Sequence, residues 1–297
     1  LRGRFPFVST LNYYYLKLFF RLIIRINKPD AIWIGRPETI DILPKTKLPI
    51  IYDCMDDYYS MHNDSSLLQQ ESKVLKSAKC IFASSNSLIR KLKERYDTSL
   101  DVKLVRNGYD GKVIPLDENS IKKIGFTLCY VGTVSIWFDF ALIDRIVEEI
   151  PDIKIIVIGP VEVSVRDKVD TYSNSSNVCF VGSVEHSKLY ETVKEFNCLI
   201  MPFVLNEIIE SVDPVKLYEY INYGKNIVSI RYDEILRFQD FVNFYSTHEE
   251  AIRIIRSLIE DNSLRYTDQE RRGFLVENTW DNRVSTINDT LKKHIDA

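Results

Sequence analysis

Residues 198–230 read CLIMPFVLNEIIESVDPVKLYEYINYGKNIVSI, and this stretch decides the fold class. Its two ends, Cys198–Pro202 and Ile227–Ile230, are short apolar runs of the kind that form buried strands. Between them, Pro214–Tyr223 carries apolar residues at helical spacing, and Asp213 before Pro214 is a typical helix start. Two strands joined through a helix predict a parallel sheet that is covered by helices.

The same alternation of apolar runs and helical patterns continues in both directions along the chain. Further strands are predicted at Ala31–Gly35, Pro49–Asp53, Cys80–Ser84, Lys103–Val105, Thr127–Gly132, Lys154–Gly159 and Val178–Val181, and further helices at Leu67–Ala78, Ser87–Arg95, Phe140–Glu149 and Ser187–Phe196. The turn signal Asn107-Gly108 and the polar run after residue 116 mark a boundary. We therefore predict two α/β domains, residues 1–115 and 122–297. A last helix at about 281–295 could close the second domain or pack back on the first.

Composition excludes several classes of protein. The 297 residues are 45% hydrophobic and 27% charged, which supports packed cores and excludes a disordered chain. The net charge of −3 combines a basic part, up to residue 118, with an acidic remainder. No basic cluster with interleaved aromatic residues is present, so nucleic acid is not an expected partner. The cysteines form no CxxC pair and the histidines are scattered, so we expect no metal site made of protein ligands.

Lys216 and Glu219 are the most informative charges in the quoted stretch. Lys216 falls in the first turn of the predicted helix, where the helix dipole favours an anion over a cation. A bound phosphate would remove this misfit, because backbone N–H groups and Lys216 would converge on it. Glu219 lies one turn further on the same face and could accept hydrogen bonds from ribose hydroxyls. Without a ligand, the two residues would be an ordinary exposed pair.

Several stretches of the chain carry a family resemblance in their order and spacing. Asn206–Tyr220 follows the pattern N-E-x-x-x-S-x-x-P-x-K-x-x-E-Y. The others are Tyr52–Asp57 (YDCMDD), Val105–Asp110 (VRNGYD), Tyr130–Asp139 (YVGTVSIWFD), Ile158–Pro160, Phe180–Val184, and Trp280 with Arg283. Together they resemble GT-B glycosyltransferases of retaining family 4, and most of all the teichuronic-acid and polysaccharide biosynthesis branch. The resemblance implies two Rossmann-like domains whose parallel sheets face each other across a cleft.

The sequence departs from that family in three places. Ser211 stands eight residues before Glu219, where the family commonly has Glu, and Glu210 is one position off. The loop after Gly132 lacks the usual Arg and Lys pair for a diphosphate. The strand and Gly-rich loop that open the family's first domain are absent, so we expect this domain to be incomplete, as in a fragment or a reduced enzyme.

The resemblance implies roles for individual residues of the second domain. Lys216 would hold the donor diphosphate and stabilise it as the sugar departs, which makes it a catalytic candidate that needs no metal. Glu219 would bind the ribose. The other donor-binding candidates are Gly132, Thr133, Trp137, Gly159, Val184, Asn206, Glu207 and Ser211. Trp137 could equally be packed under a helix. We expect no cofactor besides the nucleotide diphosphate sugar, with uridine diphosphate as first choice and guanosine diphosphate as second.

The first domain offers four polar candidates for the acceptor side. Asp53, Asp56, Asp57 and His62 lie at or beyond the carboxyl end of a predicted strand, where open α/β sheets bind ligands. Asp56 is the catalytic candidate among them, because a carboxylate there could orient the acceptor hydroxyl. Asp53 and Asp57 could instead cap a turn or a helix.

The predicted first helix, Tyr13–Lys28, combines a basic stripe with a wide apolar surface. Lys17, Arg21, Arg25 and Lys28 follow one another at intervals of four, four and three residues, which places them on one side. This pattern fits a helix packed on a sheet, and equally a helix that lies on an anionic membrane.

We therefore expect a glycosyltransferase that moves a sugar from a nucleotide diphosphate donor to a glycan or lipid-linked acceptor in surface polysaccharide synthesis. The expected location is the cytoplasm, at the inner face of the plasma membrane if the first helix binds lipid. Two alternatives stay open, namely a degenerate relative that only binds nucleotide and a GT-B-fold epimerase of nucleotide sugars.

Overall fold

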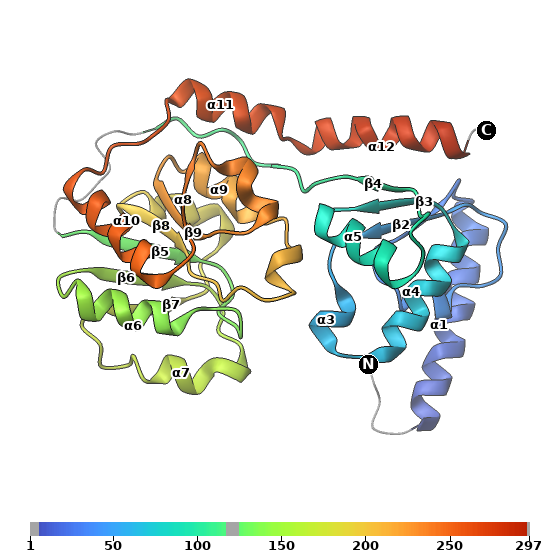
Figure 1. The fold of residues 1–297 in the computed structure, drawn as a ribbon. Coiled ribbons are helices and arrows are strands. Elements are labelled where there is room, and N and C mark those ends of the chain that lie inside the picture. The colour runs from blue at the N-terminus through green and yellow to red at the C-terminus, as the bar shows by residue number, and fades with distance from the viewer. Residues whose placement is uncertain (1–5, 117–124, 296–297) are drawn as a thin grey trace. The chain divides into compact units, whose positions relative to one another are not determined.

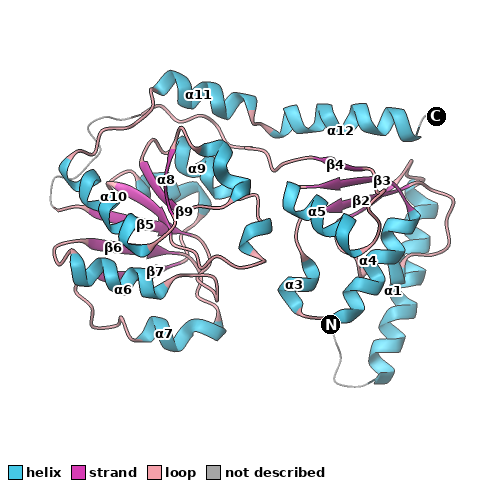
Figure 2. Cartoon of the chain, in the orientation of Figure 1, coloured by secondary structure: helices cyan, strands magenta, loops and turns pink. Residues whose placement is uncertain are grey.

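The structure is a computed structural model that describes residues 6–116 and 125–295 (Figure 1). It divides into two compact units, residues 1–106 with 283–297 and residues 107–282. Each unit contains one parallel sheet with helices. Figure 2 shows the helices in cyan and the strands in magenta. The predicted α/β fold class is therefore confirmed.

The first unit is built on a four-stranded sheet in the order β1-β2-β3-β4. The strands are β1 (Ile32–Ile34), β2 (Ile50–Cys54), β3 (Ala78–Ala83) and β4 (Val102–Leu104). The helices are α1 (Pro6–Asn27), α2 (Thr39–Ile42), α3 (Tyr58–His62), α4 (Ser65–Ser77), α5 (Asn86–Arg95) and most of α12 (Trp280–Ile295). Ile287 and Leu291 of α12 pack against the buried Ile51 and Phe82. The last helix, for which the sequence left two positions open, thus packs on the first unit.

The second unit has a six-stranded sheet in the order β10-β9-β8-β5-β6-β7. Its strands are β5 (Thr127–Val131), β6 (Lys154–Ile158), β7 (Val178–Gly182), β8 (Cys198–Met201), β9 (Asn226–Ile230) and β10 (Val242–Tyr245). Its helices are α6 (Phe140–Glu149), α7 (Arg166–Asp170), α8 (Leu189–Val193), α9 (Val215–Asn222), α10 (His248–Glu260) and α11 (Asp268–Glu277). Every residue of β8 and β9 is buried, which explains the continuous apolar run of β8 and the apolar residues Ile227, Val228 and Ile230 of β9.

The start of α9 differs from the sequence prediction. The helix begins at Val215 with Pro214 as its N-cap residue, and no side chain caps it. Asp213 instead accepts a hydrogen bond from the backbone N–H of Asn107 at 2.8 Å and forms an ion pair with Arg237. The predicted capping role of Asp213 is therefore wrong, because two groups distant in sequence engage its carboxylate.

Other differences concern elements with weak patterns. The strand β10 and the helices α10 and α11 were not predicted, and the helix expected at Ser187–Phe196 is the short α8 after a 3-10 turn, His186–Lys188. The expected first helix runs over Pro6–Asn27, so Lys28 lies just beyond its end, with a φ of 46°. The five cysteines are unbridged; four are buried, and Cys179 is exposed.

Candidate functional site

Three glycines end neighbouring strands in the second unit and bring their backbones close together. Gly132 directly follows β5, Gly159 directly follows β6, and Gly182 is the last residue of β7. All three have positive φ angles. The N–H of Gly132 donates to the carbonyl of Ile158, and the N–H of Gly159 donates to the carbonyl of Gly182, both at 2.8 Å. A Cβ on Gly159 would lie 2.0 Å from the carbonyl oxygen of Gly132. Only glycine fits this approach, and the partly exposed Gly132 forms part of the surface at this edge of the sheet.

This surface lies where the strand order reverses. β5 lies between β8 and β6. The chain therefore adds β6 and β7 on one side of β5, and then β8, β9 and β10 on its other side. β5 pairs with β8 only through Leu128 and Cys129, and the hydroxyl of Tyr220 bonds to both the N–H and the carbonyl of Val131, at 2.8 and 3.2 Å. The two strands therefore separate at their carboxyl ends, and open α/β sheets bind ligands at such crevices.

Lys216, in the first turn of α9, places its ammonium group at this crevice. A Cβ on Gly132 would be 2.4 Å from the Lys216 Nζ atom, so the ammonium lies directly against that glycine. The ammonium donates to the hydroxyl of Tyr130 at 3.2 Å and lies 4.6 Å from the centre of the Tyr130 ring and 5.1 Å from that of Phe203. Burial of this group lowers the pKa of Lys216 to about 8. In the described chain no carboxylate forms an ion pair with it.

Glu219 lies one turn further along α9, beside a pocket of about 410 Å³. Its carboxylate is 2.9 Å from the Nε2 atom of His186, and this contact raises the pKa of His186 above its ordinary value of 6.5. The pocket is lined by Tyr109, Asp110, Gly111, Lys112, Ile114, His186, Ser187, Tyr190, Glu219, Asn222 and Tyr223. It thus combines aromatic walls with a carboxylate and lies next to the Lys216 crevice along the same helix.

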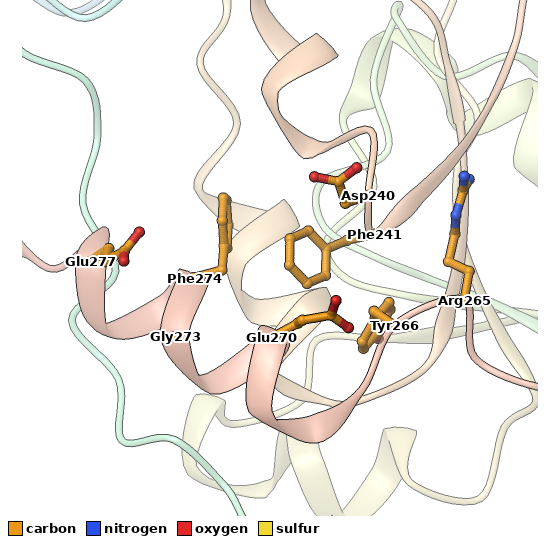
Figure 3. Close-up of a pocket in the computed structure, with 8 residues that line it drawn as sticks. All are labelled: Asp240, Phe241, Arg265, Tyr266, Glu270, Gly273, Phe274 and Glu277. Atoms are coloured by element: carbon orange, nitrogen blue, oxygen red, sulfur yellow. The ribbon is translucent and has the colours of Figure 1, made fainter.

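A second pocket, of about 490 Å³, lies between α11 and the start of β10 (Figure 3). Figure 3 shows the carboxyl groups of Asp240 and Glu270 on either side of the Phe241 ring. Glu277 adds a third carboxylate, and Arg265 is the one cation in the lining. Three carboxylates against one guanidinium would repel an anion, so this pocket does not suit a diphosphate.

The other donor-side candidates lie around the crevice, and several of their side chains have local roles. Asn206 accepts hydrogen bonds from the N–H groups of Ile208 and Ile209, both at 3.0 Å, and Ser211 donates to the carbonyl of Glu207 at 2.9 Å. These two side chains shape the loop after β8. The carbonyl of Thr133 accepts a hydrogen bond from the Tyr130 hydroxyl at 2.8 Å. The partly buried Trp137 and Val184 pack against the core of the unit.

The acceptor-side candidates of the first unit divide by their partners. Asp57 caps α3 and binds Lys91 and both terminal nitrogens of Arg95 at 2.7–2.9 Å, which holds the pKa of its carboxyl far below the usual range despite burial. Asp53 accepts from the Trp33 indole at 3.1 Å, and burial raises the pKa of its carboxyl.

Asp56 and His62 complete this group. Burial raises the pKa of the Asp56 carboxyl, and no ion pair to it occurs within residues 6–116. His62 lies exposed at the end of α3. Across the described residues, no group of three His, Cys, Asp or Glu side chains is arranged to hold a metal ion.

The sequence reasoning gave no role to three residues that shape the site. Tyr130 and Phe203 surround the Lys216 ammonium, and His186 contacts Glu219. Tyr130 stands within the stretch that carries the family resemblance, two residues before Gly132, but its contact with Lys216 spans 86 positions. Strand periodicity alone gives no signal for that contact.

Comparisons with known proteins place this geometry in context. No family model matches the chain. It is 23% identical over 196 residues to TuaH of Bacillus subtilis (strain 168), a provisionally assigned glycosyltransferase of teichuronic acid biosynthesis. That alignment covers 60% of this chain and 49% of TuaH, so the chain spans about half the length of the curated relative it matches.

Solved structures show the fold more fully. The chain superposes on Alr3699/HepE of Anabaena, solved in complex with UDP and glucose, with a TM-score of 0.71 at 14% identity, covering 92% of this chain and 80% of that one. It superposes on sucrose-phosphate synthase of Thermosynechococcus elongatus with a TM-score of 0.76 at 12% identity, covering 95% and 78%. The fold of this chain is that of the GT-B glycosyltransferases.

Proposed function

We propose that this protein is a glycosyltransferase that takes a sugar from a nucleoside diphosphate donor. The observation that carries the proposal is the Lys216 ammonium, which lies against Gly132 at the reversal of the strand order without a carboxylate partner in the described chain. A bound diphosphate would supply the missing negative charge. The likeness to structures of this fold, one of them solved with UDP and glucose, supports the same reading.

The donor would lie along the first two turns of α9. Its diphosphate would contact Lys216, the Gly132–Thr133 backbone and the turn at Gly159, and its ribose would bind Glu219. The nucleoside would then extend into the 410 Å³ pocket, where Tyr190 and Tyr223 offer aromatic surface. UDP is our first choice, because the HepE structures of the same fold contain it.

The proposed chemistry places growing negative charge next to a fixed positive one. As the sugar departs, the diphosphate gains charge, and Lys216 meets it in a poorly solvated crevice where the interaction is strong. This route uses no metal ion. We extend it to retention of the anomeric configuration and to a glycan or lipid-linked acceptor of surface polysaccharide synthesis. Asp56 is our candidate for orienting the acceptor hydroxyl.

Donor binding can be tested directly. UDP should raise the melting temperature, because a ligand that prefers the folded state stabilises it. GDP, UMP and inorganic phosphate serve as controls, since the crevice and the pocket should together favour a whole nucleoside diphosphate. The proposal would be refuted if calorimetry detects no binding of any nucleoside diphosphate at millimolar concentration. Hydrolysis of UDP-sugars then separates an enzyme from a protein that only binds nucleotide.

We also propose that α1 attaches the protein to an anionic membrane surface at the inner face of the plasma membrane. Within the described residues, no helix is long and apolar enough to span a bilayer. α1 instead exposes large apolar side chains, with Tyr14 at 64%, Leu18 at 55% and Ile26 at 74%, beside Lys17, Arg21 and Arg25. Apolar side chains next to a basic stripe are what an interfacial helix presents to lipid.

Vesicle co-sedimentation tests this attachment. The protein should bind vesicles that contain anionic lipid, and less strongly as salt rises. Arg21→Glu with Arg25→Glu should weaken binding, whereas Arg166→Glu with Lys168→Glu on α7 changes the net charge equally and should leave it nearly intact. Equal effects of the two double variants would contradict a specific role for α1.

A further inference from the structure

The hydroxyl group of Tyr130 is a junction in the proposed donor site. It donates to the carbonyl of Thr133 at 2.8 Å and accepts from the Lys216 ammonium at 3.2 Å. Tyr130 itself is fully buried, with 0% of its surface exposed. One rigid side chain thus ties the loop after β5 to the cation on α9.

The surroundings make this junction important for an anion. The loop after Gly132 has no cation over Thr133–Asp139, so the ammonium of Lys216 is the charge available at the glycine crevice. A lysine side chain has four rotatable bonds, and fixing its position costs conformational entropy that a protein must offset with contacts. Here the Tyr130 hydroxyl and the rings of Tyr130 and Phe203 supply those contacts.

We propose that Tyr130 is a positioning residue that holds the Lys216 ammonium against Gly132, ready for the diphosphate. This inference rests on the proposed function, because it takes the crevice as the donor site. Tyr130 acts through Lys216 and touches no reacting atom. The ring supports a cation through its electron-rich face, and the hydroxyl oxygen accepts one of its hydrogens.

The titration of Lys216 provides a readout that a purely structural role would not change. The titratable groups that face its ammonium are Tyr130 from β5 and Glu219 from α9, while Phe203 contributes only its ring. The pKa of Lys216 is lowered to about 8, so UDP should bind well below pH 8 and progressively less above it. Removing the hydroxyl takes an acceptor from the charged form, so the pKa of Lys216 should fall further and the decline in binding should begin at lower pH.

The experiment compares Tyr130→Phe and Tyr130→Leu with Tyr245→Phe. Tyr245 is an equally buried tyrosine of the same unit, and its hydroxyl has no hydrogen-bond partner among the described residues, so its removal controls for loss of a buried hydroxyl. At pH 7, Tyr130→Phe should weaken UDP binding roughly tenfold, as expected for a hydrogen bond to a charged group, and Tyr130→Leu should weaken it more. Tyr245→Phe should bind like the wild type.

Two titrations complete the test. Calorimetry from pH 6 to pH 9 should show the midpoint of UDP binding shifted to lower pH in both Tyr130 variants. NMR of ¹³Cε-labelled lysine, assigned with Lys216→Arg, should show the same shift without UDP. If both pH midpoints in Tyr130→Phe equal those of the wild type, the positioning role is overturned, even if the variant melts at a lower temperature. The proposed function would not be affected by that result. A wild-type protein that binds no nucleoside diphosphate would refute the proposed function and this role with it.

Discussion

Asp57 and Lys216 are each a single charge near the start of a helix that follows a parallel strand. Asp57 stands after β2 and caps α3, and Lys216 stands in the first turn of α9 after β8. The charge of Asp57 is fully engaged, because Lys91, Arg95 and Ser60 all bond to its carboxylate. Lys216 has aromatic rings, one hydroxyl and a glycine around it.

The difference separates a charge that serves the fold from one that is left for a ligand. The partners of Asp57 keep its carboxyl ionised despite burial, and they lower its pKa. Lys216 forms no ion pair within the described residues, and the attraction of Glu219 only partly offsets the burial that lowers its pKa to about 8. A cation at a helix N-terminus also opposes the helix dipole. The fold therefore bears a cost at Lys216 that a bound diphosphate would relieve.

The largest effect expected from this contrast is the loss of reaction rate in Lys216→Ala. Removing one electrostatic group that meets charge in the transition state often lowers the rate about 10²–10³-fold. The melting temperature without donor should stay the same or rise slightly, because a poorly solvated cation at a helix N-terminus is lost. A UDP-sugar hydrolysis or transfer assay, with thermal melts beside it, measures both.

Lys225 is the matched control for Lys216. Lys225 is buried, at 5% exposure, and it donates to the carbonyl of Lys194 and so anchors the backbone. Lys225→Ala should lower the melting temperature and keep the activity per folded molecule. Full activity in Lys216→Ala, or a loss of stability like that of Lys225→Ala, would show that Lys216 is structural.

Asp57→Asn should have the next largest effect, on stability rather than on donor binding. Breaking a buried ion pair leaves Lys91 and Arg95 without their anion, and we expect a loss of about 3 kcal/mol in the free energy of unfolding at pH 7. The folded pKa of Asp57 lies below the unfolded value of 3.8, so its stabilisation is present above pH 4 and is lost as the pH falls through the folded pKa. The difference between wild type and variant should therefore narrow in acid, as chemical denaturation at several pH values would show.

Asp56→Asn provides the comparison in the same loop. Burial raises the pKa of Asp56, so its ionised form is disfavoured by folding at pH 7 and its replacement should not destabilise the protein. If Asp56 orients the acceptor, this variant should slow transfer while leaving UDP affinity unchanged. The opposite pattern, with Asp57→Asn stable but inactive, would assign the acceptor role to Asp57.

The sequence predicted most strands of both sheets because their physical cause is local. A strand buried on both faces, such as β8, must be continuously apolar, and the pattern shows it. The edge strand β10 has Asn243 and half-buried positions, so its pattern is broken and it was not predicted. Asp213 shows the limit of local rules, because partners distant in sequence took the carboxylate that the helix start was expected to use.

The same reasoning explains what could be predicted of the site. Lys216 and Glu219 became candidates because their spacing along one helix, and the family resemblance of the stretch around them, are visible in the sequence. The aromatic surround of Lys216 was not, because Tyr130 and Phe203 reach it only after β5 and β8 pair in the sheet. Charges with an unfavourable local position are therefore detectable from sequence, whereas the groups that hold them in place require the fold.

Glu219→Gln tests the donor site with a smaller change than Lys216→Ala. Ribose does not change charge during transfer, so the contact should act equally on substrate and transition state. We expect the donor KM to rise about tenfold with kcat within a factor of two. Glu185→Gln, on the nearby exposed turn, should change neither. A fall in kcat with an unchanged KM would place Glu219 at the reacting sugar instead.

The smallest predicted effect concerns His186, the partner of Glu219. The carboxylate raises the pKa of His186, so their contact stabilises the fold fully below pH 6.5 and less as the pH rises through the folded pKa. The His186 side chain is 78% exposed, so solvent limits this contribution to a few tenths of a kcal/mol. In Glu219→Gln the pKa of His186 should fall toward 6.5, as NMR titration of the imidazole would show. His248, whose Nε2 lies 2.8 Å from Asp139, is the internal control, and its resonances should be the same in both proteins. An unchanged His186 titration would mean that the two side chains do not meet in solution, and Glu219 would then be open to the ribose without a competing partner.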